Sequence, residues 1–73
     1  MTERQLKRFE QEMSGYANEP VVLEQIKGTA YAFGSELACL RIFYKYRNVS
    51  KKDPLVGFAK NLNSWYFSIE MEA

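Results

Sequence analysis

Hydrophobic residues near the start of the chain recur with the spacing of one face of a helix. The residues at i, i+3 and i+7 are Leu6, Phe9 and Met13. Thr2 and Gln5 have capping-box spacing, so their side chains can satisfy the first free N–H groups of a helix. The pattern predicts a helix over residues 2–14 that is ended by Gly15.

The pattern changes after Pro20, because proline excludes a helix that runs through it. Residues 21–26 are rich in β-branched and aliphatic side chains, and Lys27-Gly28-Thr29 is a plausible turn. Residues 29–33 alternate small and aromatic side chains, as in a strand with one packed face. These features predict a β-hairpin over 21–26 and 29–33.

The segment 36–47 has two interpretations. Ser35 can cap a helix, in which Arg41, Lys45 and Asn48 form one polar stripe. Alternatively, Gly34-Ser35 closes a tight turn and the segment is a strand. One face of that strand would carry Arg41, Phe43, Lys45 and Arg47. Helix propensity in its first half favours the helix, and the strand remains the alternative.

The remaining sequence predicts a short helix and a last strand. Asp53-Pro54 is a helix start signal, since Asp can cap and Pro fits the first helical position. The residues that follow at helical spacing are Leu55, Phe58, Ala59 and Leu62. Residues 65–71 alternate apolar and polar side chains, as a half-buried strand does. Residues 1–73 therefore predict a single small α+β domain.

The composition argues against most enzyme chemistry. The chain has no histidine and one cysteine, Cys39, which excludes histidine-based catalysis and the common zinc ligand sets. We therefore expect no catalytic residues, no metal and no cofactor. A lone cysteine between apolar residues is typical of a core position in a reducing compartment. Without a signal sequence or an apolar run long enough to span a bilayer, the expected location is the cytoplasm.

Charge is distributed unevenly along a chain with net charge +1. Residues 41–60 carry six cationic side chains against Asp53, a net +5, and the rest of the chain carries −4. Cations mixed with aromatic rings can hold phosphates and stack on bases, so nucleic-acid binding through residues 41–52 is the alternative function. The candidate partner surface consists of Arg41, Phe43, Tyr44, Lys45, Arg47, Lys51, Lys52 and Tyr66.

Aromatic residues make up 15% of the chain, which is high for a domain with little volume to bury them. Exposed aromatic side chains are typical of protein interfaces. The leading hypothesis is therefore a small non-enzymatic regulator or adaptor that binds a protein partner and associates with itself as a homodimer, with the aromatic surface as its interface. Small regulators of this kind include proteins of phages and mobile elements.

Overall fold

The computed structural model describes residues 2–49 and 53–70 of the chain. Two helices and four strands follow one another along it. Their bounds are α1 (Glu3–Ala17), β1 (Val22–Ile26), β2 (Thr29–Gly34), α2 (Glu36–Val49), β3 (Leu55–Ala59) and β4 (Ser64–Glu70). The strands form one sheet in the order β1-β2-β4-β3, and every neighbouring pair is antiparallel. The predicted α+β class is confirmed.

Helix α1 begins where the sequence predicts and ends later. Thr2 and Gln5 form the reciprocal capping box, with hydrogen bonds of 2.9 and 3.2 Å. The prediction that Gly15 ends the helix is wrong, because the helix continues through it to Ala17. Asn18 ends the helix instead, since it adopts the left-handed conformation with φ of 58° and its N–H donates to the Gly15 carbonyl.

Strands β1 and β2 form the predicted hairpin. Val22 pairs with Phe33 at one end and Ile26 with Thr29 at the other. Lys27 and Gly28 both have positive φ values, 48° and 81°, as a two-residue turn of type I′ requires. The tight turn fixes the register, and the register decides which side chains of β2 face the helices.

Segment 36–47 belongs to helix α2, so the helical interpretation is confirmed and the strand alternative is wrong. The Ser35 hydroxyl accepts a hydrogen bond from the Ala38 N–H at 3.1 Å, the cap that the sequence predicts. Packing decides the conformation, because Ala38 and Ile42 are buried on one side of the helix while Tyr44 is 61% exposed on another. In a strand, Ile42 and Tyr44 would share a face.

The short helix predicted after Asp53-Pro54 is wrong. The residues in question form strand β3 and a turn, and all five residues of β3 pair with β4 without a bulge. The helical spacing was misleading, because Leu55, Phe58 and Leu62 are all exposed. Val-Gly-Phe in the middle of the segment suits a strand better, since Gly weakens a helix and the other two favour β structure.

The last strand is confirmed over Ser64–Glu70 with the predicted alternation. Trp65, Phe67 and Ile69 turn toward the helices, and Phe67 and Ile69 are buried there. Tyr66 and Ser68 lie on the opposite side of the sheet. The predicted strand extends to Met71, which lies outside the described residues.

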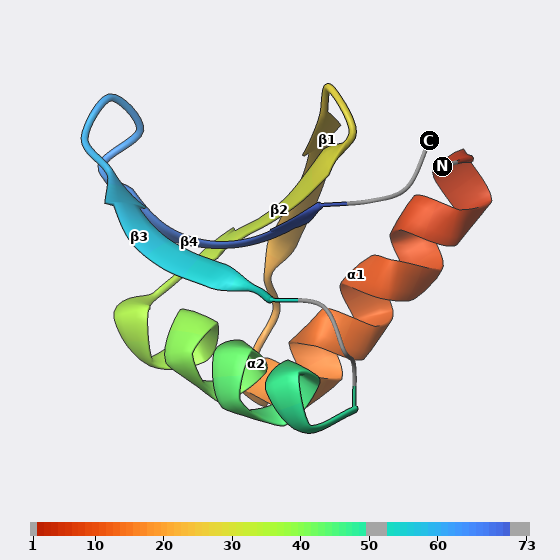
Figure 1. Cartoon of the computed structure of the whole chain (residues 1–73), viewed down its shortest axis with the longest axis horizontal. Helices are drawn as coiled ribbons and strands as arrows, with labels where there is room; N and C mark the ends of the chain where they lie inside the picture. The colour runs from red at the N-terminus through yellow and green to blue at the C-terminus, as the bar shows by residue number, and fades with distance from the viewer. Residues whose placement is uncertain (1, 50–52, 71–73) are drawn as a thin grey trace.

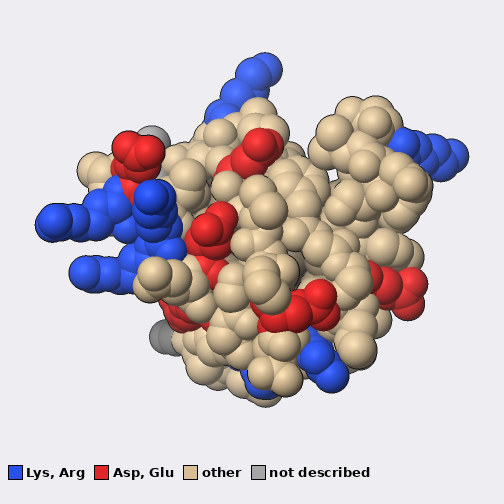
Figure 2. Space-filling view, turned by 180° about the vertical axis from the view of Figure 1, so that it is seen from behind, with Lys and Arg blue, Asp and Glu red and all other residues tan. Residues whose placement is uncertain are grey.

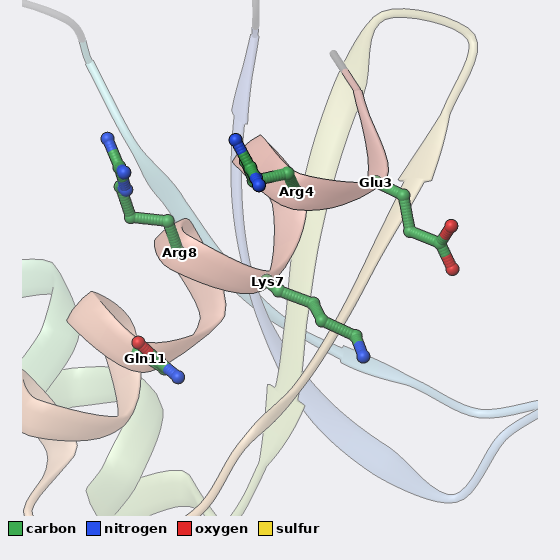
Figure 3. Close-up of a pocket in the computed structure, with 5 residues that line it drawn as sticks. All are labelled: Glu3, Arg4, Lys7, Arg8 and Gln11. Atoms are coloured by element: carbon green, nitrogen blue, oxygen red, sulfur yellow. The ribbon is translucent and has the colours of Figure 1, made fainter.

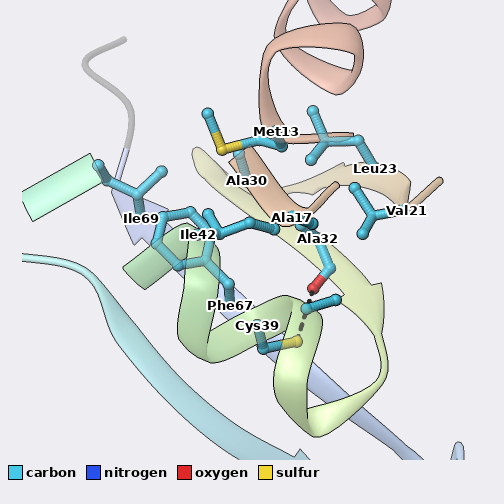
Figure 4. Packing of buried hydrophobic residues seen from close by; sticks show 11 residues of the cluster. Met13, Ala17, Val21, Leu23, Ala30, Ala32, Cys39, Ile42, Phe67 and Ile69 are labelled. Atoms are coloured by element: carbon cyan, nitrogen blue, oxygen red, sulfur yellow. Dashed lines mark hydrogen bonds between the residues drawn. The ribbon is translucent and has the colours of Figure 1, made fainter. Parts of the chain in front are cut away.

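Both helices pack on one side of the sheet, and the sheet curls away from them so that its two hairpins rise on the other side (Figure 1). Helix α2 connects β2 to β3 and crosses over β4, because β2 and β3 lie on either side of β4. The core between the layers is built largely from small side chains (Figure 4). Its residues are Met13, Ala17, Val21, Leu23, Ala30, Ala32, Ala38, Cys39, Ile42, Phe67 and Ile69.

Candidate functional site

The side of the sheet that faces away from the helices carries a cluster of aromatic rings. Ala30 and Ala32 of β2 face the helices, so their neighbours Tyr31 and Phe33 point to the uncovered side. Tyr66 of β4 pairs with Phe33 across the sheet and therefore lies on the same side. We call the uncovered side of the sheet, centred on Tyr31, Phe33 and Tyr66, the aromatic face.

The three rings of the aromatic face are packed against one another. Tyr31 stacks on Phe33 with ring centroids 6.0 Å apart and an interplanar angle of 12°. Tyr31 also meets Tyr66 edge to face at 5.8 Å. Such contacts are worth about 0.5–1.5 kcal/mol each beyond the buried area. The rings thus form one pre-organised apolar surface across the two central strands.

Gly57 of β3 lets Tyr66 lie flat across the edge of the sheet. A Cβ atom at position 57 would stand 2.7 Å from the Tyr66 hydroxyl oxygen, closer than van der Waals contact allows. Tyr66 pairs with Gly57 in the register, so the ring covers the strand backbone at the one position without a side chain. A tyrosine above a strand glycine protects the backbone and holds the ring in one place.

Exposed aliphatic side chains extend the aromatic face to both edges of the sheet. Val22 of β1 is 61% exposed and Leu55 of β3 is 66% exposed. The charged residues of the described strands that share this face are Glu24 and Glu70. No lysine or arginine occupies a strand position on this side within the part of the chain described. The face is therefore apolar at its centre with acidic side chains toward one end.

The predicted site residues do not form one surface. Tyr66 lies on the aromatic face, whereas Arg41, Phe43, Tyr44, Lys45 and Arg47 belong to α2, on the other side of the sheet. Lys51 and Lys52 lie outside the described residues. The grouping of Arg41 with Phe43, Lys45 and Arg47 on one strand face is wrong, because the segment is helical.

Two cations of α2 have roles within the fold. The Arg41 guanidinium donates to the Ala17 carbonyl oxygen at 3.1 Å, where α1 ends with unsatisfied carbonyl groups. The Arg47 guanidinium lies 5.9 Å from the centre of the Phe43 ring. Lys45 is exposed and belongs to the polar stripe that the helical interpretation predicts. Arg41 in particular joins the two helices.

Viewed from behind, lysine and arginine side chains gather over the first part of α1, and others stand singly (Figure 2). A hollow of about 500 Å³ lies at this position. It is lined by Glu3, Arg4, Lys7, Arg8 and Gln11. All five belong to one helix, and their side chains spread outward from it (Figure 3). With no second wall, this hollow does not enclose a ligand.

The titratable groups with displaced pKa values are not arranged for catalysis. Burial raises the pKa of the Cys39 thiol to about 11, and its sulfur lies 4.0 Å from the Ala32 carbonyl oxygen (Figure 4). A protonated, buried thiol is unreactive. The Tyr16 hydroxyl donates to the Glu12 carboxylate at 2.7 Å, and this hydrogen bond raises the pKa of Tyr16. That pair lies on the exposed surface of α1.

Within residues 2–49 and 53–70, no group of three or more potential metal-ligating His, Cys, Asp or Glu side chains comes together. No helix in the same part of the chain is long and apolar enough to cross a membrane. Comparison with protein-family models, curated proteins and solved structures finds no match to the chain. Function must therefore be inferred from the surfaces of the molecule itself.

Sequence reasoning missed Tyr31 and Phe33 as site residues. The alternation over 29–33 indicates a strand with one packed face, but does not say which set of side chains is packed. The small size of Ala30 and Ala32 was the available signal, because two helices can approach a sheet closely only over small residues. The aromatic members of the alternation are then left for the other side.

Proposed function

We propose that the chain is a small non-enzymatic protein-binding module, a regulator or adaptor that holds its partner on the aromatic face. The observation that carries the proposal is the set of packed rings of Tyr31, Phe33 and Tyr66 on a sheet side that no helix covers. Exposed apolar surface with clustered aromatic residues is the usual character of a protein interface. Pre-organised rings also lose little conformational entropy on binding.

The charges on the aromatic face favour a protein partner over a nucleic acid. Glu24 is a charged and exposed strand residue of this face, and carboxylates repel phosphates. The cations of α2 lie on the opposite side of the sheet from the rings. One ligand therefore does not contact rings and cations on a single surface, as it would if residues 41–47 formed a strand. The partner that fits is a protein segment with apolar side chains flanked by lysine or arginine.

The lone buried thiol of Cys39 suits a reducing compartment, and we place the protein in the cytoplasm. The absence of histidine from the sequence supports a binding role rather than acid–base catalysis. In the leading hypothesis the homodimer also uses the aromatic surface. The edge of strand β3 is a different surface at which two copies can meet.

A displayed library of random peptides tests the aromatic face directly. Binders selected on the unaltered protein should be rich in apolar and basic residues and should shift the amide resonances of β2 and β4. Replacement of two rings, Tyr31→Ser with Phe33→Ser, should weaken their binding by at least about tenfold, as loss of central aromatic contacts does. The matched control is Tyr44→Ser, which removes an exposed ring from α2 and should leave binding unchanged.

Circular dichroism confirms that each variant is folded before binding is compared. Binders whose affinity depends on Tyr44 and not on Tyr31 and Phe33 would contradict the proposal, as would a library that yields none. Salt-sensitive binding of single-stranded oligonucleotides that is lost in a Lys45→Gln, Arg47→Gln variant would instead support the nucleic-acid function.

A further inference from the structure

The two edge strands of the sheet, β1 and β3, differ in whether another element hydrogen-bonds to their outer side. At the β1 edge, α1 lies alongside the strand, and its side chains accept one N–H group of the strand and one just before it. The Glu10 carboxylate accepts from the Leu23 N–H at 2.9 Å, and the Ser14 hydroxyl accepts from the Val21 N–H at 3.2 Å. An edge whose N–H groups are already bonded cannot serve as a template for another strand. The first part of the β1 edge is therefore occupied by α1.

The β3 edge lacks the features that normally protect an edge strand. Residues 55–59 read Leu-Val-Gly-Phe-Ala, with no charge, no proline and no bulge in their pairing with β4. Natural edge strands are usually protected by one of these devices. Within residues 2–49 and 53–70, no other element hydrogen-bonds to the outer side of β3. Leu55 and Phe58 are also exposed, Phe58 by 44%.

We infer that β3 pairs in antiparallel fashion with β3 of a second copy of this chain, centred on Gly57. This register pairs all five residues of the strand. It places Val56 opposite Phe58 of the second copy, Leu55 opposite Ala59, and Gly57 opposite Gly57. Pairs of β-branched and aromatic residues stabilise adjacent strands, and the larger Leu55 meets a small side chain. No like charges meet, so the strand is complementary to itself.

Self-pairing of β3 joins two four-stranded sheets into one and places both aromatic faces on the same side of it. Tyr66 lies over Gly57, so the Tyr66 rings of the two copies flank the two-fold axis. The aromatic face then continues from one copy to the other. The interface uses backbone groups of β3 rather than the aromatic rings, so dimerisation does not depend on whether the aromatic face binds a partner.

Cysteine cross-linking tests the register. In the Leu55→Cys, Ala59→Cys double variant, each new thiol faces one of the second copy at a Cα separation of about 4.5–5.5 Å, within disulfide range. Within one chain, positions 55 and 59 are about 13 Å apart along the strand, too far to bridge. Oxidation should therefore give a covalent dimer. Either single variant is the control and should stay monomeric on denaturing gels, because the buried Cys39 contributes little background.

Analytical ultracentrifugation of the unaltered protein and of two lysine variants completes the test. Phe58→Lys should weaken the dimer by at least about tenfold, because symmetry removes the Val56–Phe58 pair twice. Leu37→Lys, an equally apolar exposed residue on α2, is the matched control and should leave the dimer intact. A protein that sediments as a monomer at high micromolar concentration would overturn the inference. So would a dimer that neither cross-links in the double variant nor responds to Phe58→Lys.

Discussion

Replacing Ile42 with alanine tests which side of α2 holds the two layers together. Ile42 is fully buried between the helices and the sheet. The change removes three carbon atoms, worth about 0.8 kcal/mol each in transfer free energy. The cavity left behind adds to this, so we expect a loss of about 3–4 kcal/mol in the free energy of unfolding. A domain of 73 residues has roughly 4–11 kcal/mol in total, so the variant should lose a large part of its stability.

Urea denaturation followed by Trp65 fluorescence and by circular dichroism measures the loss of stability. With a slope near 1 kcal/mol per molar urea, the midpoint should fall by roughly 3 M. Ile42→Val should cost only about 0.5–1.5 kcal/mol. The matched control is Leu37→Ala on the same helix, where a side chain that is 54% exposed should cost less than about 1 kcal/mol. Equal losses for Ile42→Ala and Leu37→Ala would refute the packing described for α2.

Three further outcomes follow from individual contacts. Ser35→Ala removes the hydroxyl that accepts from the Ala38 N–H and should lower stability by about 1 kcal/mol, measured by thermal unfolding. An unchanged melting temperature would show that this cap does not stabilise the helix. Gly57→Ala should push the Tyr66 ring aside, visible as changed NMR shifts of its ring protons, at a cost of about 1 kcal/mol. Stability should be independent of the Cys39 thiol below about pH 8 and fall as pH rises toward 11, by about 2–3 kcal/mol, because the unfolded chain ionises at lower pH than the buried thiol. Urea titrations at pH 8 and 10.5 check this slope, which should be smaller in Cys39→Ala, where the raised pKa of Tyr16 still contributes.

The elements that local signals define could be predicted from the sequence. The capping box of α1, the type I′ turn and the alternating last strand all depend on residues close together in the chain. Such signals act within a few residues, so the surrounding fold does not change their meaning. The end of α1 was predicted too early because Gly15 permits a left-handed conformation without requiring it, while Asn18 is the residue that adopts it.

Strand β3 was not predicted, because its own residues do not show that it pairs with β4, the next strand along the chain. Its apolar residues satisfy a helical spacing, and Asp53-Pro54 is a credible helix start. Pairing with the long strand β4 overrides both signals. The same limit applies to the candidate site, because the pairing of Tyr66 with Phe33 and Gly57 exists only in the sheet. Of the predicted site residues, only Tyr66 therefore belongs to the aromatic face.

Most of the aromatic residues lie outside the fully buried core. Among the eleven aromatic residues, only Phe67 belongs to the buried cluster, which otherwise consists of aliphatic side chains, alanines and Cys39. Several others, such as Tyr46 and Trp65, are partly buried and pack around the margins of that cluster. Tyr31, Phe33 and Tyr66 lie on the side of the sheet without helices, where they are half-buried against one another and against strand β3. The proposed function uses the part of these rings that stays accessible, because that surface would become buried in a complex.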